Sequence, residues 1–336
     1  MYIRYLLAIL LFVVVGGCQN HDDAPSTLTD VRVGITQSYL GEAATFVAQE
    51  QGYFEDHGLN VQFEENTSGS TSIRELFEGK VHIAHVAETP VVYSLVDSSY
   101  YEGKQVPPFQ IFADMIYADE IQHIVGRKDA GIESPKDIAG KRVGVYNGTQ
   151  LDYFLDSFLL EHQVSQASLR LLDMTPAEQL KTITSGKIDV AVTWEPYASY
   201  IKQRLGDQAI FLDTKLTYST LWLAVTLNRY GTKNSDVLTN YLKALHQADT
   251  YIEEHPRSAQ QLLARRTGVP IAAVEATWNH LDFELSLSER MITLLDEQSR
   301  WMQRNNVADT SEIDFRSLIN FEPMRAVYPK GITVIQ

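Results

Sequence analysis

The chain has 336 residues but only one cysteine, Cys18. A disulfide within the chain is therefore excluded, and packed apolar cores must stabilise the fold. Long apolar runs are equally scarce. The most prominent run extends from Leu6 to Val15, which is too short for the roughly 20 residues that span a bilayer. Because Arg4 precedes this run and Gly16-Gly17 follows it, the pattern is typical of a secretory signal peptide.

Positive charge is also in short supply. The chain has 28 Lys and Arg against 43 Asp and Glu, for a net charge of −15. A nucleic-acid-binding protein presents a basic surface to the phosphates, so we expect no nucleic-acid partner. The apolar fraction of 44% is ordinary for a globular protein. We therefore expect a soluble body after the signal peptide.

The segment Val15-Gly16-Gly17-Cys18 resembles a bacterial lipobox. In that class of signal the cysteine is diacylated and becomes the first residue of the mature protein. Two acyl chains give stable anchoring, whereas one is marginal. We predict a lipoprotein signal peptide over 1–17, a lipid-anchored tether over 18–30, and an exported protein held at the bacterial cell envelope. The alternative is an ordinary signal peptide that contains a cysteine.

The strongest pattern in the chain is a repeat. The run from Glu78 to Pro90 returns as Ser185 to Pro196, and Val31–Ile35 corresponds to Lys141–Val145. In each copy a short apolar strand leads into a polar loop. Two copies of one α/β unit predict two similar lobes, and equivalent loops of two lobes can face each other across a cleft. A cleft between domains is a favoured place for a small ligand.

Strands and helices are expected to alternate through both copies, which predicts mostly parallel sheets flanked by helices. Apolar alternation and β-branched residues indicate the strands, and capping residues indicate the helix starts. The expected strands are 31–35, 59–63, 81–86, 121–127, 141–146, 169–173 and 188–193. The expected helices are 42–51, 70–78, 151–162 and 177–185. Beyond Thr232 the chain is predicted to be mainly helical, with helices at 235–254, 259–267, 271–280 and 288–305.

Several motifs carry a family resemblance. Gly52-Tyr53-Phe54, the stretch 128–143 and Trp194-Glu195-Pro196-Tyr197 resemble segments of the substrate-binding proteins of ABC importers. The group in question is the NMT1/THI5-like family, which handles nitrate, sulfonates, taurine and thiamine precursors. The resemblance covers roughly 31–283. One departure is His82, where the family usually has Asp.

The resemblance implies a two-lobed fold of the periplasmic binding protein type (type II). The chain then crosses twice between the lobes, so that lobe 1 comprises 31–116 and 219–336 and lobe 2 comprises 117–218. The implied partners are a small-molecule ligand and an ABC permease with its ATPase. We expect a monomer without a cofactor.

The candidate site follows from where the parallel strands end, because ligands of open sheets bind beyond the carboxyl ends of the strands. Several of these ends lead into helix N-termini, which hold anions through unpaired N–H groups and a partial positive charge. The predicted ligand-binding residues are Gln37, Ser38, Tyr39, Ser68, Gly69, Ser70, Thr71, Glu88, Thr89, Asn147, Gly148, Thr149, Trp194 and Glu195.

Other roles stay open for these residues. The small polar ones can be helix caps and turns, and Tyr39 and Trp194 can be core residues. Glu88 and Glu195 occupy matching positions in the two copies, where they can bind an amine of the ligand or serve as caps and lobe-closing residues. We expect no metal site, because His82 and His85 are three apart on a presumed strand and point to opposite faces.

The ligand class also stays open. Loops rich in backbone donors favour a sulfonate, taurine or nitrate, whereas tyrosines near the strand ends suit a flat heterocycle such as a thiamine-precursor pyrimidine. A ligand-sensing protein without transport is a further alternative. We expect no enzyme, because relatives that make the thiamine pyrimidine use a cysteine cluster, whereas the single cysteine of this chain lies in the signal region.

Overall fold

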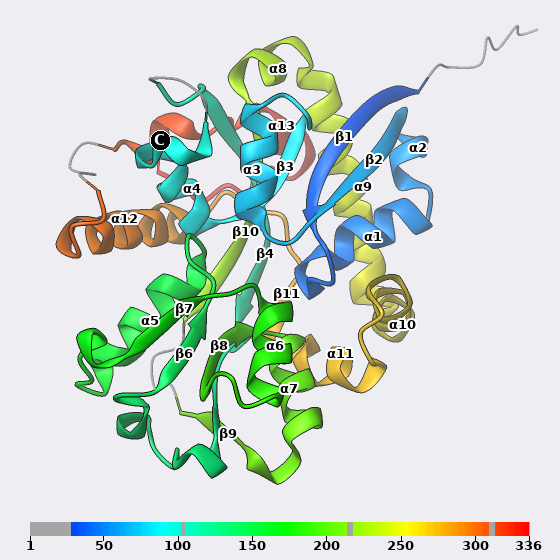
Figure 1. Cartoon of the computed structure of the whole chain (residues 1–336). Helices are drawn as coiled ribbons and strands as arrows, with labels where there is room; N and C mark the ends of the chain where they lie inside the picture. The colour runs from blue at the N-terminus through cyan, green and yellow to red at the C-terminus, as the bar shows by residue number, and fades with distance from the viewer. Residues whose placement is uncertain (1–27, 102–104, 214–217, 309–312, 336) are drawn as a thin grey trace, which may run out of the picture.

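The computed structural model describes residues 28–101, 105–213, 218–308 and 313–335. The predicted signal peptide, Cys18 and most of the predicted tether lie outside this part of the chain. Two α/β lobes lie one above the other, with the chain crossing between them near the middle (Figure 1). No helix within the described ranges is both long and apolar enough to cross a membrane.

Lobe 1 is built on a sheet with the order β11-β4-β10-β3-β1-β2. Its strands are β1 (Thr29–Thr36), β2 (Leu59–Asn66), β3 (Ile83–Ala87), β4 (Phe109–Asp119), β10 (Ser219–Leu227) and β11 (Leu281–Asp282). Its helices are α1 (Ala43–Glu50), α2 (Tyr53–Asp56), α3 (Gly69–Phe77), α4 (Glu88–Val96), α8 (Asn228–Lys233), α9 (Ser235–Glu254), α10 (Pro256–Thr267), α11 (Ile271–Thr277), α12 (Glu289–Arg304) and α13 (Glu322–Val327). Helices cover both faces of this sheet, so that every residue of β3 is buried.

Lobe 2 is built on a smaller sheet with the order β7-β6-β8-β5-β9. Its strands are β5 (Gln122–Arg127), β6 (Arg142–Val145), β7 (Arg170–Asp173), β8 (Val190–Trp194) and β9 (Ala209–Leu212). Its helices are α5 (Gln150–Glu161), α6 (Pro176–Thr184) and α7 (Tyr197–Leu205). Helix starts follow the capping chemistry of the sequence: Thr175 and Glu178 form a capping box at α6.

The repeat is visible in the register of both sheets. The parallel trio β2-β1-β3 in lobe 1 has the same order as β7-β6-β8 in lobe 2. Val33 pairs with Ile83 in the first trio, and its counterpart Val143 pairs with Val190 in the second. The two copies are therefore equivalent down to individual strand pairs.

The two-lobed fold is confirmed, but both sheets are mixed rather than mostly parallel. The strands that carry the chain between the lobes run antiparallel to their neighbours: β10 against β3 and β4, and β5 against β8 and β9. Tyr117 and Ala118 still pair with β10 in lobe 1. This pairing continues to Asp119 with Ser219, and the expected lobe boundaries at 117 and 218 stay predictions. In the return crossing, residues 214–217 lie outside the described part.

His82 fills the role that Asp189 has in the second copy. Asp189 Oδ2 accepts a hydrogen bond of 2.9 Å from the backbone N–H of Arg142, and His82 Nδ1 accepts one of 3.2 Å from the backbone N–H of Arg32. Burial, with Arg32 nearby, lowers the pKa of His82 and favours the neutral ring that can accept. The departure from the family pattern therefore preserves the contact between the strands.

Candidate functional site

The strand ends of both lobes meet at a small cavity at the junction between the lobes. It encloses about 10 Å³, roughly the space of one water molecule, so the lobes are closed on each other. None of the described residues that line it carries a charged side chain. The lining residues are Thr36, Tyr39, Ser68, Gly69, Ala87, Pro90, Thr149, Gln150, Trp194 and Trp222.

Three helices begin at this cavity. Helix α3 starts at Gly69, and its N-cap Ser68 makes no side-chain capping bond, because the Ser68 hydroxyl lies 2.8 Å from the Ser70 hydroxyl instead. Helix α4 starts after Ala87, also without a side-chain cap. Helix α5 starts after Thr149, whose hydroxyl accepts from Leu151 N at 3.3 Å. The unpaired N–H groups of helix starts attract negative charge, so these three starts offer donors to an anion at the cavity, although the carboxylates of Glu42, Glu88 and Asp114 lie near Tyr39.

Two buried hydroxyl groups at the cavity have no hydrogen-bond partner among the described residues. They are Thr36 Oγ1 and the phenol of Tyr39, whose residues are 3% and 2% exposed. Burial, followed by the carboxylates of Glu88 and Glu42, raises the pKa of Tyr39, so the phenol keeps its proton and remains a donor. Buried polar groups are nearly always paired, so these two favour a polar ligand at this place.

A buried polar network holds the aromatic wall of the cavity. The Trp222 indole donates to Glu42 Oε1 at 2.9 Å, and Glu42 Oε2 lies 2.8 Å from His85 Nδ1. The other ring nitrogen of His85 lies 2.9 Å from the Tyr241 hydroxyl. Because Trp222 is held in this way, the Tyr39 ring packs on a fixed surface, with ring centroids 4.5 Å apart. Trp194 forms the wall on the lobe 2 side.

Glu88 and Glu195 lie outside the cavity lining and are engaged elsewhere. Glu88 accepts from the Tyr218 hydroxyl, from Leu221 N at 3.0 Å and from Gln298 Nε2 at 3.0 Å. Burial raises the pKa of Glu88 in spite of these bonds. Glu195, which precedes a cis peptide bond to Pro196, accepts from Ser199 N at 3.1 Å and lies 3.3 Å from His123 Nε2. These contacts favour the capping and lobe-closing interpretation over amine binding.

The structure brings five of the predicted residues to the cavity: Tyr39, Ser68, Gly69, Thr149 and Trp194. Gln37 and Asn147 are exposed, and Ser38 donates to Thr267 O at 3.2 Å. Ser70, Thr71, Thr89 and Gly148 lie in the same loops and helix starts but do not line the cavity.

The two glycines have different reasons to be glycine. A Cβ on Gly69 would lie 2.8 Å from Val86 Cα, so the start of α3 can pack on β3 only without a side chain. Gly148 has φ of 72°, a left-handed turn that favours glycine.

Five lining residues were not predicted. Thr36, Ala87 and Gln150 belong to the strand-end loops that the sequence indicates, but they were not among the residues selected from those loops. Pro90 lies in the first turn of α4. Trp222 lies within the apolar run of β10, where no sequence signal separates it from a core residue.

Direct hydrogen bonds join the lobes beside the cavity. The Tyr100 hydroxyl donates to Gly148 O at 3.1 Å, and the Tyr93 hydroxyl donates to Asp152 Oδ2 at 3.2 Å. The Trp301 indole donates to Asp156 Oδ2 at 2.8 Å. Burial raises the pKa of Asp152 to about 6. These contacts come from α4, from the short turn that follows it and from α12, and they join the lobes on this side of the cavity.

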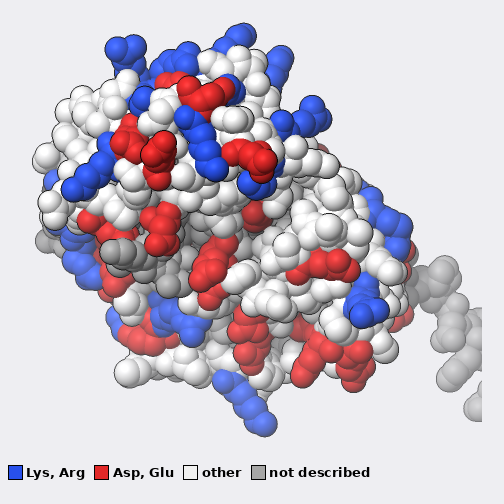
Figure 2. Space-filling model, turned by 90° about the horizontal axis from the view of Figure 1, so that it is seen from below, with Lys and Arg blue, Asp and Glu red and all other residues white. Residues whose placement is uncertain are grey.

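The charge of the surface differs from that of the cavity. Figure 2 shows acidic side chains following one another across the middle and lower part of the face seen from below. Two larger hollows, of about 570 and 550 Å³, lie outside the cavity and are lined by several carboxylates. Neither suits an anion. No group of three or more His, Cys, Asp and Glu residues within the described ranges is placed to hold a metal ion.

Comparisons with known proteins agree with this geometry. Residues 41–259 match the family described as "NMT1/THI5 like", and the chain belongs to that family. The taurine-binding periplasmic protein of Escherichia coli (strain K12) is 22% identical over 251 residues, which are 71% of this chain and 74% of that protein.

The fold is that of a periplasmic binding protein. The alkanesulfonate-binding protein SsuA from Xanthomonas axonopodis pv. citri, solved bound to MOPS, superposes with a TM-score of 0.73. The match has 17% identity and covers 87% of this chain and 98% of that one. The desulfurization enzyme DSZB has the same fold, with a TM-score of 0.64, 14% identity and coverage of 90% and 99%.

Proposed function

We propose that this protein is the solute-binding component of an ABC importer and that it holds a small organic anion of the sulfonate type between its lobes. The observation that carries the proposal is the cavity itself: three helix starts and two unpartnered buried hydroxyls meet there without any charged side chain. Such a site neutralises an oxyanion through N–H and O–H donors alone. The family and the taurine- and alkanesulfonate-binding proteins that resemble the chain support the same role.

Capture and release require the lobes to separate. The closed cavity of about 10 Å³ has no room for a sulfonate and its organic tail, so the ligand must enter an open form. In the open form the helix starts of lobe 1 meet the anion first, and Thr149 and Trp194 arrive as lobe 2 closes. Hinge closure of this kind is the common motion of two-lobed binding proteins.

The aromatic residues around the cavity favour an apolar or flat group next to the anionic group of the ligand. Tyr39, Trp194 and Trp222 offer ring faces and edges beside the anion site. They suit the short alkyl chain of an alkanesulfonate or taurine. They also favour the second candidate, a flat heterocycle such as a thiamine-precursor pyrimidine, which would stack on the same rings.

We propose binding rather than catalysis. The hydroxyl groups of the lining belong to Thr36, Tyr39, Ser68 and Thr149, and no His, Asp, Glu or Lys among the described lining residues accompanies them as a general base. The protein is further proposed to be exported and held at the cell envelope through lipids on Cys18, and to deliver its ligand as a monomer to the permease and ATPase.

The proposal is tested by a thermal-shift screen of taurine, alkanesulfonates, nitrate, pyrimidines and diamines, followed by calorimetry. A ligand that binds the folded state stabilises it by RT ln(1 + [L]/Kd). We expect a shift with a sulfonate, and we expect this shift to be lost in a cleft variant such as Trp194→Ala. Any shift with a diamine should persist in that variant. If nitrate or a pyrimidine shifts the melting temperature and no sulfonate does, the sulfonate assignment is wrong. If no anion or heterocycle binds, the cleft is not the site.

A further inference from the structure

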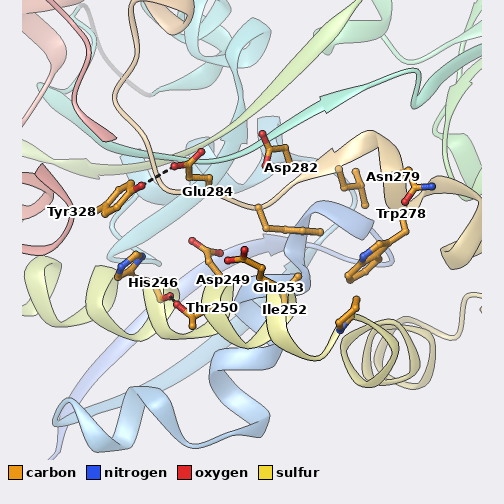
Figure 3. Close-up of a pocket in the computed structure, with 13 residues that line it drawn as sticks. His246, Asp249, Thr250, Ile252, Glu253, Trp278, Asn279, Asp282, Glu284 and Tyr328 are labelled. Carbon is orange, nitrogen blue, oxygen red and sulfur yellow. Dashed lines mark hydrogen bonds between the residues drawn. The ribbon is translucent and has the colours of Figure 1, made fainter. Parts of the chain in front are cut away.

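A second hollow lies in lobe 1, away from the junction between the lobes. It encloses about 570 Å³, within the range of small-molecule sites. One wall is the C-terminal half of α9, and the opposite wall is the segment 278–284 that follows α11. Figure 3 shows the side chains of the two walls pointing toward each other, with Tyr328 at one end and Trp278 at the other.

The hollow is strongly acidic. Four carboxylates line it, those of Asp249, Glu253, Asp282 and Glu284, whereas the described lining residues include no Lys or Arg. Glu284 accepts a hydrogen bond of 2.8 Å from the Tyr328 hydroxyl. Arg290 lowers the pKa of Asp282, but its guanidinium lies over the Tyr117 ring, 4.0 Å from the ring centroid. The cationic partners of the other three carboxylates are missing from the described residues.

Asp249 distinguishes this hollow from an ordinary acidic surface. The residue is only 8% exposed, and neither carboxylate oxygen has a hydrogen-bond partner in the described part of the chain. Burial, followed by Glu284 and Asp282, raises the pKa of Asp249, and the nearby Leu285 N–H offsets this only in part. In Figure 3 the carboxylate of Asp249 points into the hollow beside that of Glu253. A buried carboxylate that the neighbouring Leu285 N–H does not satisfy is costly unless a ligand supplies a donor.

We propose that this hollow binds an organic polyamine, with one ammonium group between Asp249 and Glu253 and another near Glu284. An ammonium group carries three donors and pairs well with carboxylates. A flexible diamine or oligoamine can place two such groups at separate carboxylates. Trp278, Phe283 and Ile252 line the same hollow and give its methylene chain an apolar wall and aromatic faces.

A metal ion fits the arrangement poorly. Calcium takes six to eight oxygen ligands around one point, whereas no cluster of three ligating side chains is found in the described ranges. The spread of the carboxylates along the hollow instead matches a ligand with spaced charges. The site is also independent of the proposed anion site, because it has the opposite polarity and lies within one lobe.

The experiment is calorimetric titration of the purified full chain with 1,4-diaminobutane and spermidine. Butylamine tests the need for a second ammonium group, and calcium chloride tests the metal alternative. We expect both polyamines to bind, butylamine to bind more weakly and calcium not to bind. Wild-type protein that binds neither polyamine tighter than about 1 mM, or that binds calcium instead, overturns the proposal.

Three variants locate the site. Asp249→Asn keeps the shape of the side chain and removes its charge, and Glu253→Gln does the same at an exposed position that cannot disturb the fold. Each should weaken polyamine binding roughly tenfold or more, the effect of losing a hydrogen bond between charged groups. Glu254→Gln is the matched control, since Glu254 is an exposed neighbour on α9 that does not line the hollow. Equal weakening by all three variants would indicate general surface charge and overturn the assignment.

The cleft variants separate this site from the proposed function. Trp194→Ala should leave polyamine binding unchanged, because Trp194 lies at the junction of the lobes. If Trp194→Ala abolishes polyamine binding, the amine binds in the cleft, and the site in lobe 1 is refuted. If the polyamines bind as expected and no anion does, the proposed function fails while this site stands.

Discussion

Replacing Tyr39 with Phe should raise the free energy of unfolding and weaken ligand binding. Both effects arise from the loss of one oxygen atom, the Tyr39 hydroxyl. The Tyr39 hydroxyl is buried and has no partner among the described residues. An unsatisfied buried polar group costs about 1–3 kcal/mol, so removing it should raise the free energy of unfolding by up to that amount. The ring itself stays, and with it the contact to Trp222.

The ligand-bound state should respond the other way. If the phenol donates to the oxyanion, its loss removes a hydrogen bond to a charged group, which contributes about 1.5–3 kcal/mol. The dissociation constant of the sulfonate identified by screening should therefore rise by roughly 10- to 150-fold. Denaturant unfolding measures the first effect, and titration calorimetry measures the second.

A matched tyrosine provides the control. The Tyr241 hydroxyl is equally buried but lies 2.9 Å from His85 Nε2, so Tyr241→Phe should lower the free energy of unfolding by about 1 kcal/mol or more. The two substitutions are chemically identical and should shift stability in opposite directions. If Tyr39→Phe destabilises the protein and binds the sulfonate with native affinity, the hydroxyl has no role at the site, and the argument from unpartnered groups is wrong.

Four further predictions follow from the same structure. Trp194→Ala should weaken binding by roughly 2 kcal/mol, about thirtyfold, and Ser70→Leu should block the start of α3; native affinity of both folded variants in calorimetry would contradict the cleft site. Cys18→Ala should move the protein from the membrane fraction to the soluble one, whereas continued labelling with palmitate would contradict lipidation. The pKa of Asp152 is raised to about 6 from 3.8, so the folded protein holds this proton more tightly than the unfolded chain. The contribution of Asp152 to stability should therefore be full below pH 3.8 and be lost as the pH rises through 6. Asp152→Asn should remove that part of the pH dependence in unfolding titrations. An unchanged pH profile of the variant would contradict the burial of this carboxyl group in solution. Small-angle scattering should show a smaller radius of gyration with the ligand than without it, and equal values would argue against closure.

The parts of the fold that could be predicted are those in which local pattern and final structure agree. The strands of the two repeats were recognised because their apolar alternation is local, and helix α9 matches its predicted bounds, 235–254. Strands β4 and β10 were not predicted. Their pairing partners are separated by up to 118 residues along the chain, as for Phe109 with Leu227, and no local sequence pattern indicates such a contact.

The candidate site shows the same division. Ser68 and Thr149 were found because a small polar residue between a strand and a helix has a local signature. Trp222 was missed because its role depends on Glu42, which holds its indole from a distant part of the chain. The symmetry of the repeat suggested one role for Glu88 and Glu195, yet their partners differ. Glu88 accepts hydrogen bonds from Tyr218 and Gln298. Glu195 instead accepts one from the backbone N–H of Ser199 in the helix that follows it and lies next to His123.

The two crossings between the lobes leave the first sheet side by side. Strands β4 and β10 are neighbours along most of their length, and Asp119 at the end of one is paired with Ser219 at the start of the other. A single connecting segment would leave the relative orientation of two lobes unrestricted, whereas two adjacent connections restrict it mainly to rotation about one axis. We therefore expect rotation about the axis through both connections to be the easier motion, because the hydrogen-bonded pairing of β4 with β10 resists twisting about the long axis of the molecule. The lobes should therefore close in the same relative orientation each time. A ligand site made of residues from both lobes then has the same geometry in every round of binding and release.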